Sequence, residues 1–321
     1  MRRILHHRTG RALSAALLTL VAATASPTAV AAAQGEPDMG ALIVGGRRAS
    51  EVYPAVGSLM FDVPTADRRG VHTCGVTLIE RGWAVTAAHC VTDPPTEPTA
   101  AANRSWLTPA GTPVRDKRFH LSLGAIDRTA GTPAGVRNIV VHPGWAWGAG
   151  PGDVGDWALV RLDRQLELQP MELAGPPARL GAPIRLLGWG LTAPNGSGTP
   201  PIHLQELDTR VLAPVSCAAV GITTAELCLD NPWDVAGPCS GDSGGPALVR
   251  ANGRWQFAGV ASRNTGAYCG DGPAVYTSAP AYREWAYRVM RGQLPLVPLA
   301  PAQGGPVDSP WAPILTTDHR G

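Results

Sequence analysis

One serine in this sequence lies in a segment suited to nucleophilic chemistry. Ser243 has glycines at 241, 244 and 245 around it, and the carboxylate of Asp242 immediately before it. A serine hydroxyl is a poor nucleophile unless a base removes its proton and hydrogen-bond donors stabilise the oxyanion that its attack creates. Glycines let backbone N–H groups turn toward that oxyanion because they carry no Cβ. The segment therefore predicts a serine nucleophile at position 243.

A base and a carboxylate that could activate this serine occur far upstream in the chain. His89 stands in the sequence TAAHC, and Asp156 opens the sequence DWALVRL. An imidazole can take the proton of a hydroxyl and later return it, while a carboxylate holds the imidazole in the required orientation. In residue type, surrounding sequence and chain order, His89, Asp156 and Ser243 resemble the catalytic residues of the chymotrypsin/trypsin family of serine proteases.

Asp153 is a competing carboxylate, three positions before Asp156. The family's aspartate is followed directly by a strand with the pattern apolar-Ala-Leu-apolar-basic-Leu, and only Asp156 has that sequence behind it. The resemblance therefore favours Asp156 as the residue that orients His89. It also implies that Ser262 makes a hydrogen bond to this aspartate.

The resemblance covers most of the chain, from Ile43 to Gly292. It implies an all-β fold of two antiparallel Greek-key β-barrels with a C-terminal helix, and an active site in the cleft between the barrels. It also implies an oxyanion hole made by the backbone N–H groups of Gly241 and Ser243. Three further segments carry the resemblance: VVHP at 140–143, GWG at 188–190 and PAVY at 273–276.

The sequence also predicts the short strands that such a fold needs. Runs rich in β-branched residues are broken by Gly, Pro or Asp, which favours antiparallel β-structure over βαβ units. The predicted strands are Thr73–Ile79, Trp83–Ala88, Val136–Val141, Trp157–Leu162, Ile184–Leu187, Trp255–Ala261 and Ala274–Thr277. One helix is predicted after them: Ser278 can cap it, Pro280 lies in its first turn, and Gly292 can end it.

The carboxylate of Asp242 needs a positive partner, because a free charge beside the nucleophile would repel the anionic intermediate. In the family that partner is the N-terminal ammonium of an Ile-Val-Gly-Gly segment, which is released when a propeptide is removed. This chain has the segment at Ile43–Gly46. The resemblance thus implies a zymogen cleaved before Ile43, with an ion pair between Ile43 and Asp242. Because Leu42 precedes the cleavage site, the activating protease must accept leucine rather than arginine or lysine.

The six cysteines suit three disulfides in an exported protein. Spacing alone leaves their pairing open. The resemblance implies the pairs Cys74–Cys90, Cys217–Cys228 and Cys239–Cys269. With no cysteine left over there is no candidate catalytic thiol, and no Cys-x-x-Cys pair indicates a metal site. We expect neither a metal nor an organic cofactor.

Substrate preference is the point at which the sequence departs from trypsin. The S1 pocket binds P1, the substrate residue before the scissile bond. In the family, the residue at the base of this pocket lies six positions before the nucleophile. Trypsin-type members carry aspartate there, whereas this chain has Gly237. Without a buried anion, a substrate arginine or lysine would be desolvated with no counter-charge. The pocket is also assigned Pro238, Asn264 and Ala274, and Ala274 narrows it where many members have glycine. We expect a small or medium apolar P1 residue.

The N-terminus has the character of a targeting segment. Arginines at its start precede an apolar run, Ala12–Val21, and a small-residue site at Ala31–Ala33, a pattern typical of a secretory signal peptide. The run is short for a membrane span, so we expect no membrane anchor. We expect a secreted, extracellular protein that is a monomer. The expected segments are a signal peptide 1–33, a propeptide 34–42, a protease domain 43–292 and a proline-rich, flexible tail 293–321.

The formal net charge of +2 gives no reason to expect nucleic acid as a partner. The expected partners are a peptide or protein substrate and the activating protease.

Two other classes of function compete with a protease. A catalytically silent homologue that acts as a binding protein would usually have lost a triad residue or an oxyanion glycine, and all are present here. The predicted insertion Val91–Arg118 keeps this alternative open, because a long loop near the cleft could recognise a partner. An esterase with a nucleophile elbow would share the spacing Gly241-x-Ser243-x-Gly245, but such hydrolases place the nucleophile before the histidine in the chain.

Overall fold

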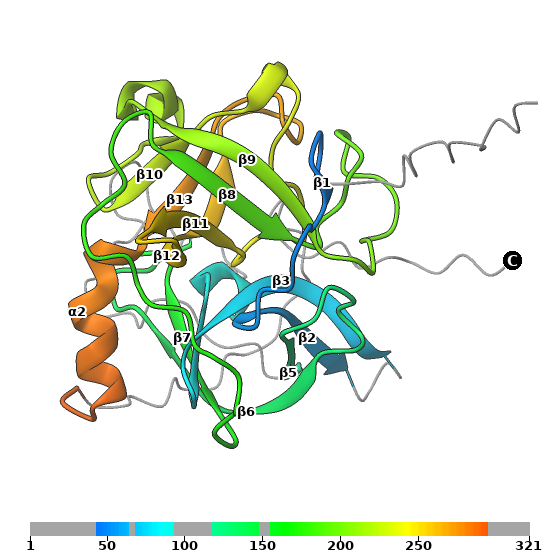
Figure 1. Cartoon of the computed structure of the whole chain (residues 1–321), viewed down its shortest axis with the longest axis vertical. Coiled ribbons are helices and arrows are strands. Elements are labelled where there is room, and N and C mark those ends of the chain that lie inside the picture. The colour runs from blue at the N-terminus through cyan, green and yellow to red at the C-terminus, as the bar shows by residue number, and fades with distance from the viewer. Residues whose placement is uncertain (1–42, 64–67, 93–116, 148–154, 295–321) are drawn as a thin grey trace, which may run out of the picture. The chain divides into compact units, whose positions relative to one another are not determined.

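Two antiparallel β-barrels make up the described part of the chain, which the computed structural model gives for residues 43–63, 68–92, 117–147 and 155–294 (Figure 1). The first barrel is closed, in the order β2-β3-β4-β7-β6-β5. Its strands are β2 (Val56–Val63), β3 (Arg68–Glu80), β4 (Trp83–Thr86), β5 (Arg118–Leu123), β6 (Thr132–Val141) and β7 (Ala158–Leu162).

The second barrel closes in the order β8-β9-β10-β13-β12-β11, because β11 pairs back with β8. Its strands are β8 (Pro183–Gly188), β9 (Gln205–Leu212), β10 (Glu226–Leu229), β11 (Pro246–Ala251), β12 (Arg254–Asn264) and β13 (Ala274–Ser278). The short strand β1 (Arg47–Arg48) joins this sheet beside β9. Both barrels therefore connect their strands in the same spatial order, a repetition that the sequence does not reveal.

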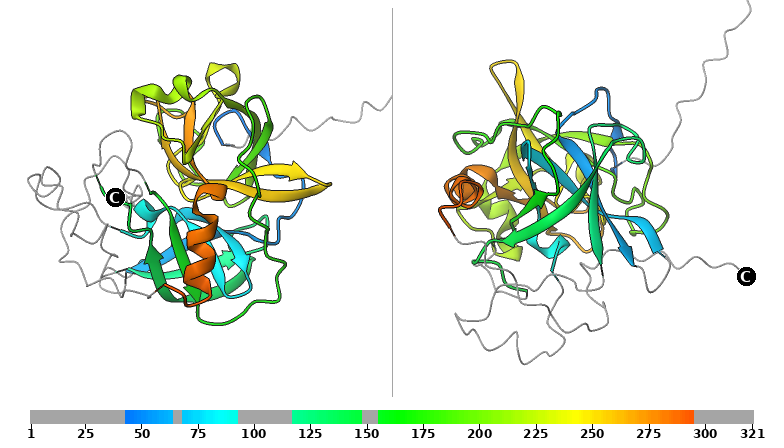
Figure 2. Two further views of the ribbon diagram at one scale, coloured as in Figure 1. Left: turned by 90° about the vertical axis from the view of Figure 1, so that its left-hand side faces the viewer. Right: turned by 90° about the horizontal axis from the view of Figure 1, so that it is seen from below.

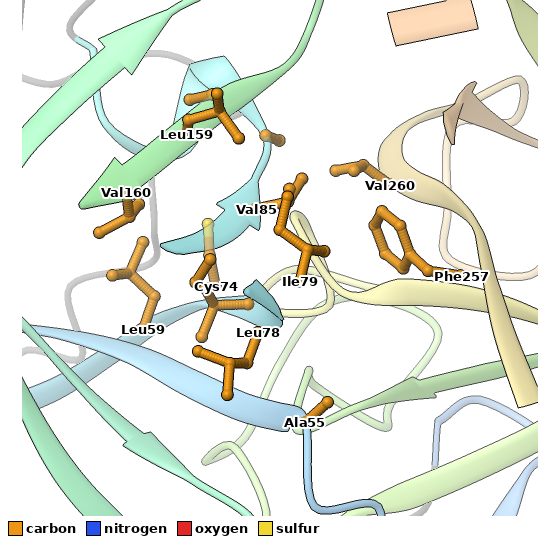
Figure 3. Packing of buried hydrophobic residues seen from close by; sticks show 14 of the residues in the cluster. Ala55, Leu59, Cys74, Leu78, Ile79, Val85, Leu159, Val160, Phe257 and Val260 are labelled. Carbon is orange, nitrogen blue, oxygen red and sulfur yellow. The ribbon is translucent and has the colours of Figure 1, made fainter. Parts of the chain in front are cut away.

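The largest buried cluster of the described residues crosses from one barrel to the other. Figure 3 shows Ile79 and Val85 of the first barrel close to Phe257 and Val260 of β12 in the second. All four side chains are buried. Because the free energy gained on burial grows with apolar area, by about 25 cal/mol per Å², a single core stabilises each barrel and also their contact.

The C-terminal helix α2 (Ala279–Met290) lies along the first barrel (Figure 2). The ring of Tyr282 stacks on Trp157 at a centroid distance of 5.4 Å and an interplanar angle of 12°. The ring of His142 meets Tyr282 and Trp285 edge to face, at 4.8 and 4.9 Å. Since Trp157 follows Asp156 in the chain, the helix packs directly behind a candidate site residue.

All seven predicted strands overlap observed ones, although Trp83–Ala88 was predicted too long, because Ala88 already begins the 3₁₀ helix η2 (Ala88–Cys90). Strands β1, β2, β5, β9, β10 and β11 were not predicted. In β9, Glu206 is buried on the face opposite Leu207 and Val211, where it pairs with Arg47 and Arg185. With charged residues at 206, 208 and 210, β9 lacks the run of β-branched residues by which the other strands were predicted.

The predicted helix is observed, but the role given to Ser278 is wrong. Its side chain makes no capping hydrogen bond. Its backbone instead ends β13, where Ser278 pairs with Gly259 and donates its N–H to the carbonyl of Ala225 at 2.9 Å. Pro280 does lie in the first turn, and Gly292, with φ +69°, follows the last turn.

Several predicted segments lie outside the described residues. They are the processing segments up to residue 42, residues 93–116 of the predicted insertion and the tail beyond Leu294. Within the part of the chain that the structure describes, no helix is long and apolar enough to cross a membrane.

Candidate active site

The carboxylate of Asp156 organises the candidate site. It lies just before β7 and is almost completely buried. Its Oδ1 accepts a hydrogen bond from the backbone N–H of His89 at 3.0 Å, and its Oδ2 lies 2.7 Å from His89 Nδ1. The hydroxyl of Ser262, from β12 of the other barrel, donates to Oδ2 at 2.7 Å. This orients the imidazole as the sequence predicts and gives Ser262 the predicted contact.

The surroundings of Asp156 favour its ionised form. Burial alone would raise the pKa of this carboxyl, but the charge and hydrogen bonds of His89 and the hydroxyl of Ser262 outweigh that effect and lower the pKa below its usual value. Asp156 therefore stays negative at the pH at which a histidine base works. The competing Asp153 lies outside the described residues.

Ser243 lies in the turn before β11, where glycines let the two barrels approach closely. The N–H of Gly75 in the first barrel donates to the Ser243 carbonyl at 2.7 Å. A Cβ on Gly75 would stand 2.4 Å from the Cα of Gly245, and a Cβ on Gly244 would stand 2.2 Å from the Thr86 hydroxyl. Gly241, the other predicted oxyanion donor, has φ +96°, which a side chain would strain.

A cavity of about 250 Å³ brings these residues together. The cavity is lined by His89 and Ser243, and also by Gly241 and Ser262. The Nε2 atom of His89 is buried and has no hydrogen-bond partner among the described residues. Since Nδ1 is occupied by Asp156, this Nε2 is the nitrogen available to exchange a proton with a group in the cavity.

The carboxyl group of Asp242 is buried and accepts hydrogen bonds from two backbone N–H groups. Its Oδ1 accepts from the N–H of Gly190 at 2.8 Å and its Oδ2 from that of Cys239 at 2.9 Å. Burial raises the pKa of this carboxyl to about 7, although both hydrogen bonds act to lower it. The described residues provide no salt-bridge partner for it. A Cβ on Gly188 or Gly190 would overlap the carboxyl group, which explains the Gly-Trp-Gly sequence.

The segment Ile43–Gly46 lies against the loop that leads to Asp242. Ile43 is buried in the core of the second barrel. Val44 pairs with Gly237, whose N–H donates to the Val44 carbonyl at 2.9 Å. A Cβ on Gly45 would stand 2.5 Å from that of Ala236. The residue predicted to become the new N-terminus is thus buried, next to a segment that pairs with the loop leading to Asp242.

The four residues assigned to the S1 pocket lie on neighbouring segments, and two of them line the cavity. Pro238 and Asn264 line the cavity, and the Asn264 side chain donates to the Pro238 carbonyl at 3.1 Å. Ala274 pairs with Asn264 across β12 and β13, so its side chain points to the same side of the sheet. Gly237 and Ala274 are not among the residues that line the cavity.

Sequence reasoning did not find two polar contacts at this site. Arg263, which also lines the cavity, forms a bidentate ion pair with the wholly buried Glu226. His72 lies 2.7 Å from the Ser58 hydroxyl through Nδ1 and 3.1 Å from the Gly241 carbonyl through Nε2. Burial lowers the pKa of His72 to about 3, so it is neutral at ordinary pH. The strands of His72 and Arg263 carry several other polar residues, so no signal in the sequence singled out either one.

The structure joins the cysteines in the three pairs that the resemblance implies: Cys74–Cys90, Cys217–Cys228 and Cys239–Cys269. The first pair ties η2, and with it His89, to β3. Cys74, Cys90 and His89 also form the one cluster of potential metal ligands found in the described residues. Because the two sulfur atoms are bonded to each other, they offer no thiolate to a metal.

Comparison with known proteins agrees with this geometry. Residues 43–286 match the Trypsin family. Chymotrypsin-like elastase family member 1 of Canis lupus familiaris is 29% identical over 276 residues, which covers 80% of this chain and 95% of that protein. The same protein of Felis catus is 28% identical over 267 residues, with 79% and 91% covered. The chain belongs to the trypsin family of serine proteases and is a serine endopeptidase.

A solved structure also resembles this one. It is described as neuropsin, a serine protease expressed in the limbic system of mouse brain. It superposes with a TM-score of 0.59 at 23% identity, covering 77% of this chain and all of the other. At this identity the similarity supports the fold.

The pocket around Asp242 gives a direct test. In the variant Gly190→Ala the new Cβ would lie 2.4 Å from the Asp242 carboxyl carbon, so the loop that carries Ser243 has to move. We expect kcat/KM to fall by about 10²-fold, the order of loss caused by a misplacement of about 1 Å. Gly82→Ala is the matched control, because the nearest atom to its Cβ would be 3.8 Å away. Equal activity of the two variants in a peptide hydrolysis assay would contradict this account.

Proposed function

We propose that the protein hydrolyses peptide bonds through an acyl-enzyme intermediate, with His89, Asp156 and Ser243 as its catalytic triad. Ser243 Oγ attacks the carbonyl carbon of the scissile bond while its proton passes to His89 Nε2. The N–H groups of Gly241 and Ser243 stabilise the oxyanion of the tetrahedral intermediate. The C–N bond then breaks as Nε2 returns the proton to the leaving amine. Water repeats the sequence on the acyl ester and releases the second product.

The orientation of His89 is the observation that carries this proposal. Asp156 holds Nδ1, Nε2 is left without a partner, and His89 and Ser243 line one cavity. A silent homologue that serves only as a binding protein has no comparable support, because every triad residue and both oxyanion donors are present.

Substitution of the triad tests the assignment. We expect Ser243→Ala to lower kcat by about 10⁶-fold, since triad members act as a unit. Asp156→Asn should lower it by about 10⁴-fold through a misoriented imidazole, whereas the control Asp153→Asn should stay close to the wild type. A fluorophosphonate probe should label the wild type and not Ser243→Ala. If the effects of the two aspartate variants were reversed, Asp153 would be the orienting residue.

We further propose that the protein is made with a signal peptide 1–33 and a propeptide 34–42, and that the mature, extracellular enzyme is a monomer. Residues 43–292 are then the protease domain, and 293–321 a proline-rich tail. The three disulfides support an extracellular location, because such bonds persist in oxidising environments.

The enzyme is proposed to be a zymogen that becomes active when an activating protease cleaves between Leu42 and Ile43. The support is electrostatic: Asp242 is buried with two backbone donors and no cation in the described residues. An ammonium at Ile43 would compensate this charge, lower the pKa of Asp242 and hold the loop that carries Gly241 and Ser243.

Modification of the N-terminus tests this switch. We expect a precursor that begins at Gln34 to have a kcat/KM lower by about 10²-fold than a chain that begins at Ile43, because the oxyanion loop lacks its charge partner. Lys117 is the one lysine of the sequence. In the variant Lys117→Arg, cyanate can therefore carbamylate the α-amino group without a competing lysine. Carbamylation should lower the activity of the Ile43 form to that of the precursor. If the carbamylated enzyme kept its full activity, the proposed ion pair between Ile43 and Asp242 would be wrong.

The pH dependence of stability follows from the same carboxyl group. In the precursor, the folded-state pKa of Asp242 is about 7, above its ordinary value near 3.8. Between these values the unfolded chain releases a proton that the folded chain keeps, so the free energy of unfolding falls as pH rises from about 4 to 7. In the Ile43 form the pKa is lower, and this fall should be smaller.

The proposed P1 preference is for uncharged residues of small or medium size. No aspartate or glutamate is among the described residues that line the cavity, and Arg263, which does line it, has its charge compensated by Glu226. A substrate arginine or lysine would therefore lose its hydration without a counter-charge. The contact between Asn264 and the Pro238 carbonyl also limits the width of the cavity.

A peptide library with varied P1 residues tests this preference. We expect the wild type to favour alanine and valine over arginine and lysine. Asn264→Gly removes the side chain that contacts Pro238, and should raise kcat/KM for phenylalanine relative to alanine by about 10-fold. Asn252→Gly, in the turn between β11 and β12, is the matched control and should keep the wild-type ratio. A strong preference for arginine or lysine in the wild type would overturn the assignment of the pocket.

A further inference from the structure

Three large apolar side chains are exposed on two adjoining loops of the second barrel. Trp233 is 75% exposed and Val235 58%, both in the loop that contains the 3₁₀ helix η4 (Pro232–Asp234). Tyr268 is 61% exposed in the loop between β12 and β13. Single exposed apolar residues are ordinary, whereas a group of them at one place marks an interaction surface.

Contacts between the loops hold this surface together. The Asn231 side chain donates a hydrogen bond to the Gly270 carbonyl at 3.2 Å. A Cβ on Gly270 would stand 2.4 Å from the Val235 carbonyl oxygen, so the two backbones touch. The disulfide Cys239–Cys269 joins the same two stretches of chain. The exposed side chains are therefore carried by a cross-linked pair of loops rather than by a free one.

The backbone at Trp233 is strained. Trp233 and Asp234 have φ of +58° and +57°, the left-handed conformation in which a side chain other than glycine's costs stability. A glycine would form the same turn at a lower cost. Since Trp233 is exposed, burial of its indole does not offset this cost. Contact with another molecule explains the tryptophan better.

The surface reaches the active-site cavity through one of its three residues. Tyr268 lines that cavity, together with Gly266 and Ala267 of the same loop. An endopeptidase binds its substrate as an extended chain that is longer than the residue in the pocket. Such a chain leaves the cavity across its rim, and Trp233 and Val235 lie on the loop bonded to the one that carries Tyr268.

We propose that Trp233, Val235 and Tyr268 form a docking surface for apolar residues of the substrate that flank those in the cavity. This inference rests on the proposed peptidase function. The occupant is the substrate chain itself, and aromatic side chains suit it because they offer large contact areas at a small entropic cost. The enzyme then selects by residues distant from the scissile bond as well as by P1.

Kinetics with substrates of two lengths test the proposal. The short substrate is a tripeptide p-nitroanilide with alanine at P1. The long ones are internally quenched peptides around the same tripeptide, extended by six residues on either the N-terminal or the C-terminal side, with leucines or serines in the extension. For the wild type we expect one leucine-extended peptide to have a kcat/KM about 10-fold above its serine counterpart. The side on which the gain occurs gives the direction of binding.

The variant Trp233→Gly separates docking from a structural role. We expect it to abolish most of the leucine advantage, to leave the short substrate unchanged and to keep or raise the melting temperature. Asn252→Gly is the matched control, because it also places glycine at a left-handed residue, with φ +51°, and should keep the leucine advantage.

Three results would count against the docking surface. It is overturned if Trp233→Gly keeps the leucine advantage, if the short and long substrates lose activity together, or if the wild type does not distinguish leucine from serine extensions. A wild-type enzyme that hydrolyses none of these substrates would instead overturn the proposed function, and this inference with it.

Discussion

The hydrogen bonds of Asp156 are the interaction on which the rest of the site depends. This one carboxylate receives the backbone and imidazole of His89 from the first barrel and the hydroxyl of Ser262 from the second. It therefore sets the direction of the base and at the same time joins the two halves that carry base and nucleophile. Two features keep the barrels close enough for these hydrogen bonds to form. They are the common apolar core around Phe257 and Val260 and the close approach of Gly75 and Gly245.

The two buried aspartates of the site differ in how their charge is compensated. Asp156 receives enough hydrogen bonds, with a histidine among its partners, to keep its pKa low in spite of burial. Asp242 receives two backbone N–H groups and no cation in the described residues, and its pKa rises to about 7. Asp156 is thus held in its ionised form. Asp242, beside the nucleophile, has no cation among the described residues to stabilise its negative charge. That difference is the physical basis on which the proposed activation rests.

Much of the fold could be predicted from the sequence, because β-branched runs broken by Gly and Pro mark strands such as β3, β6 and β12. In the missed strand β9, burial depends on tertiary contacts: Glu206 can be buried because Arg47 and Arg185 reach it. At the site, motifs predicted the triad, since their chemistry requires particular residues in order. The pair Arg263–Glu226 and the absence of Gly237 from the cavity wall could not be predicted, because each depends on where distant segments meet.

The cavity is lined by both barrels, with Thr73 and His89 from the first and Pro238 and Asn264 from the second. Any molecule that fills it binds only while the barrels are in contact. By thermodynamic linkage, such a ligand stabilises the contact by about 2.7 kcal/mol at a concentration of 100 times its Kd. Binding of a ligand and contact between the barrels are therefore coupled. An inhibitor in the cavity would also slow the separation of the two barrels, and with it the exposure of their shared core to proteolysis.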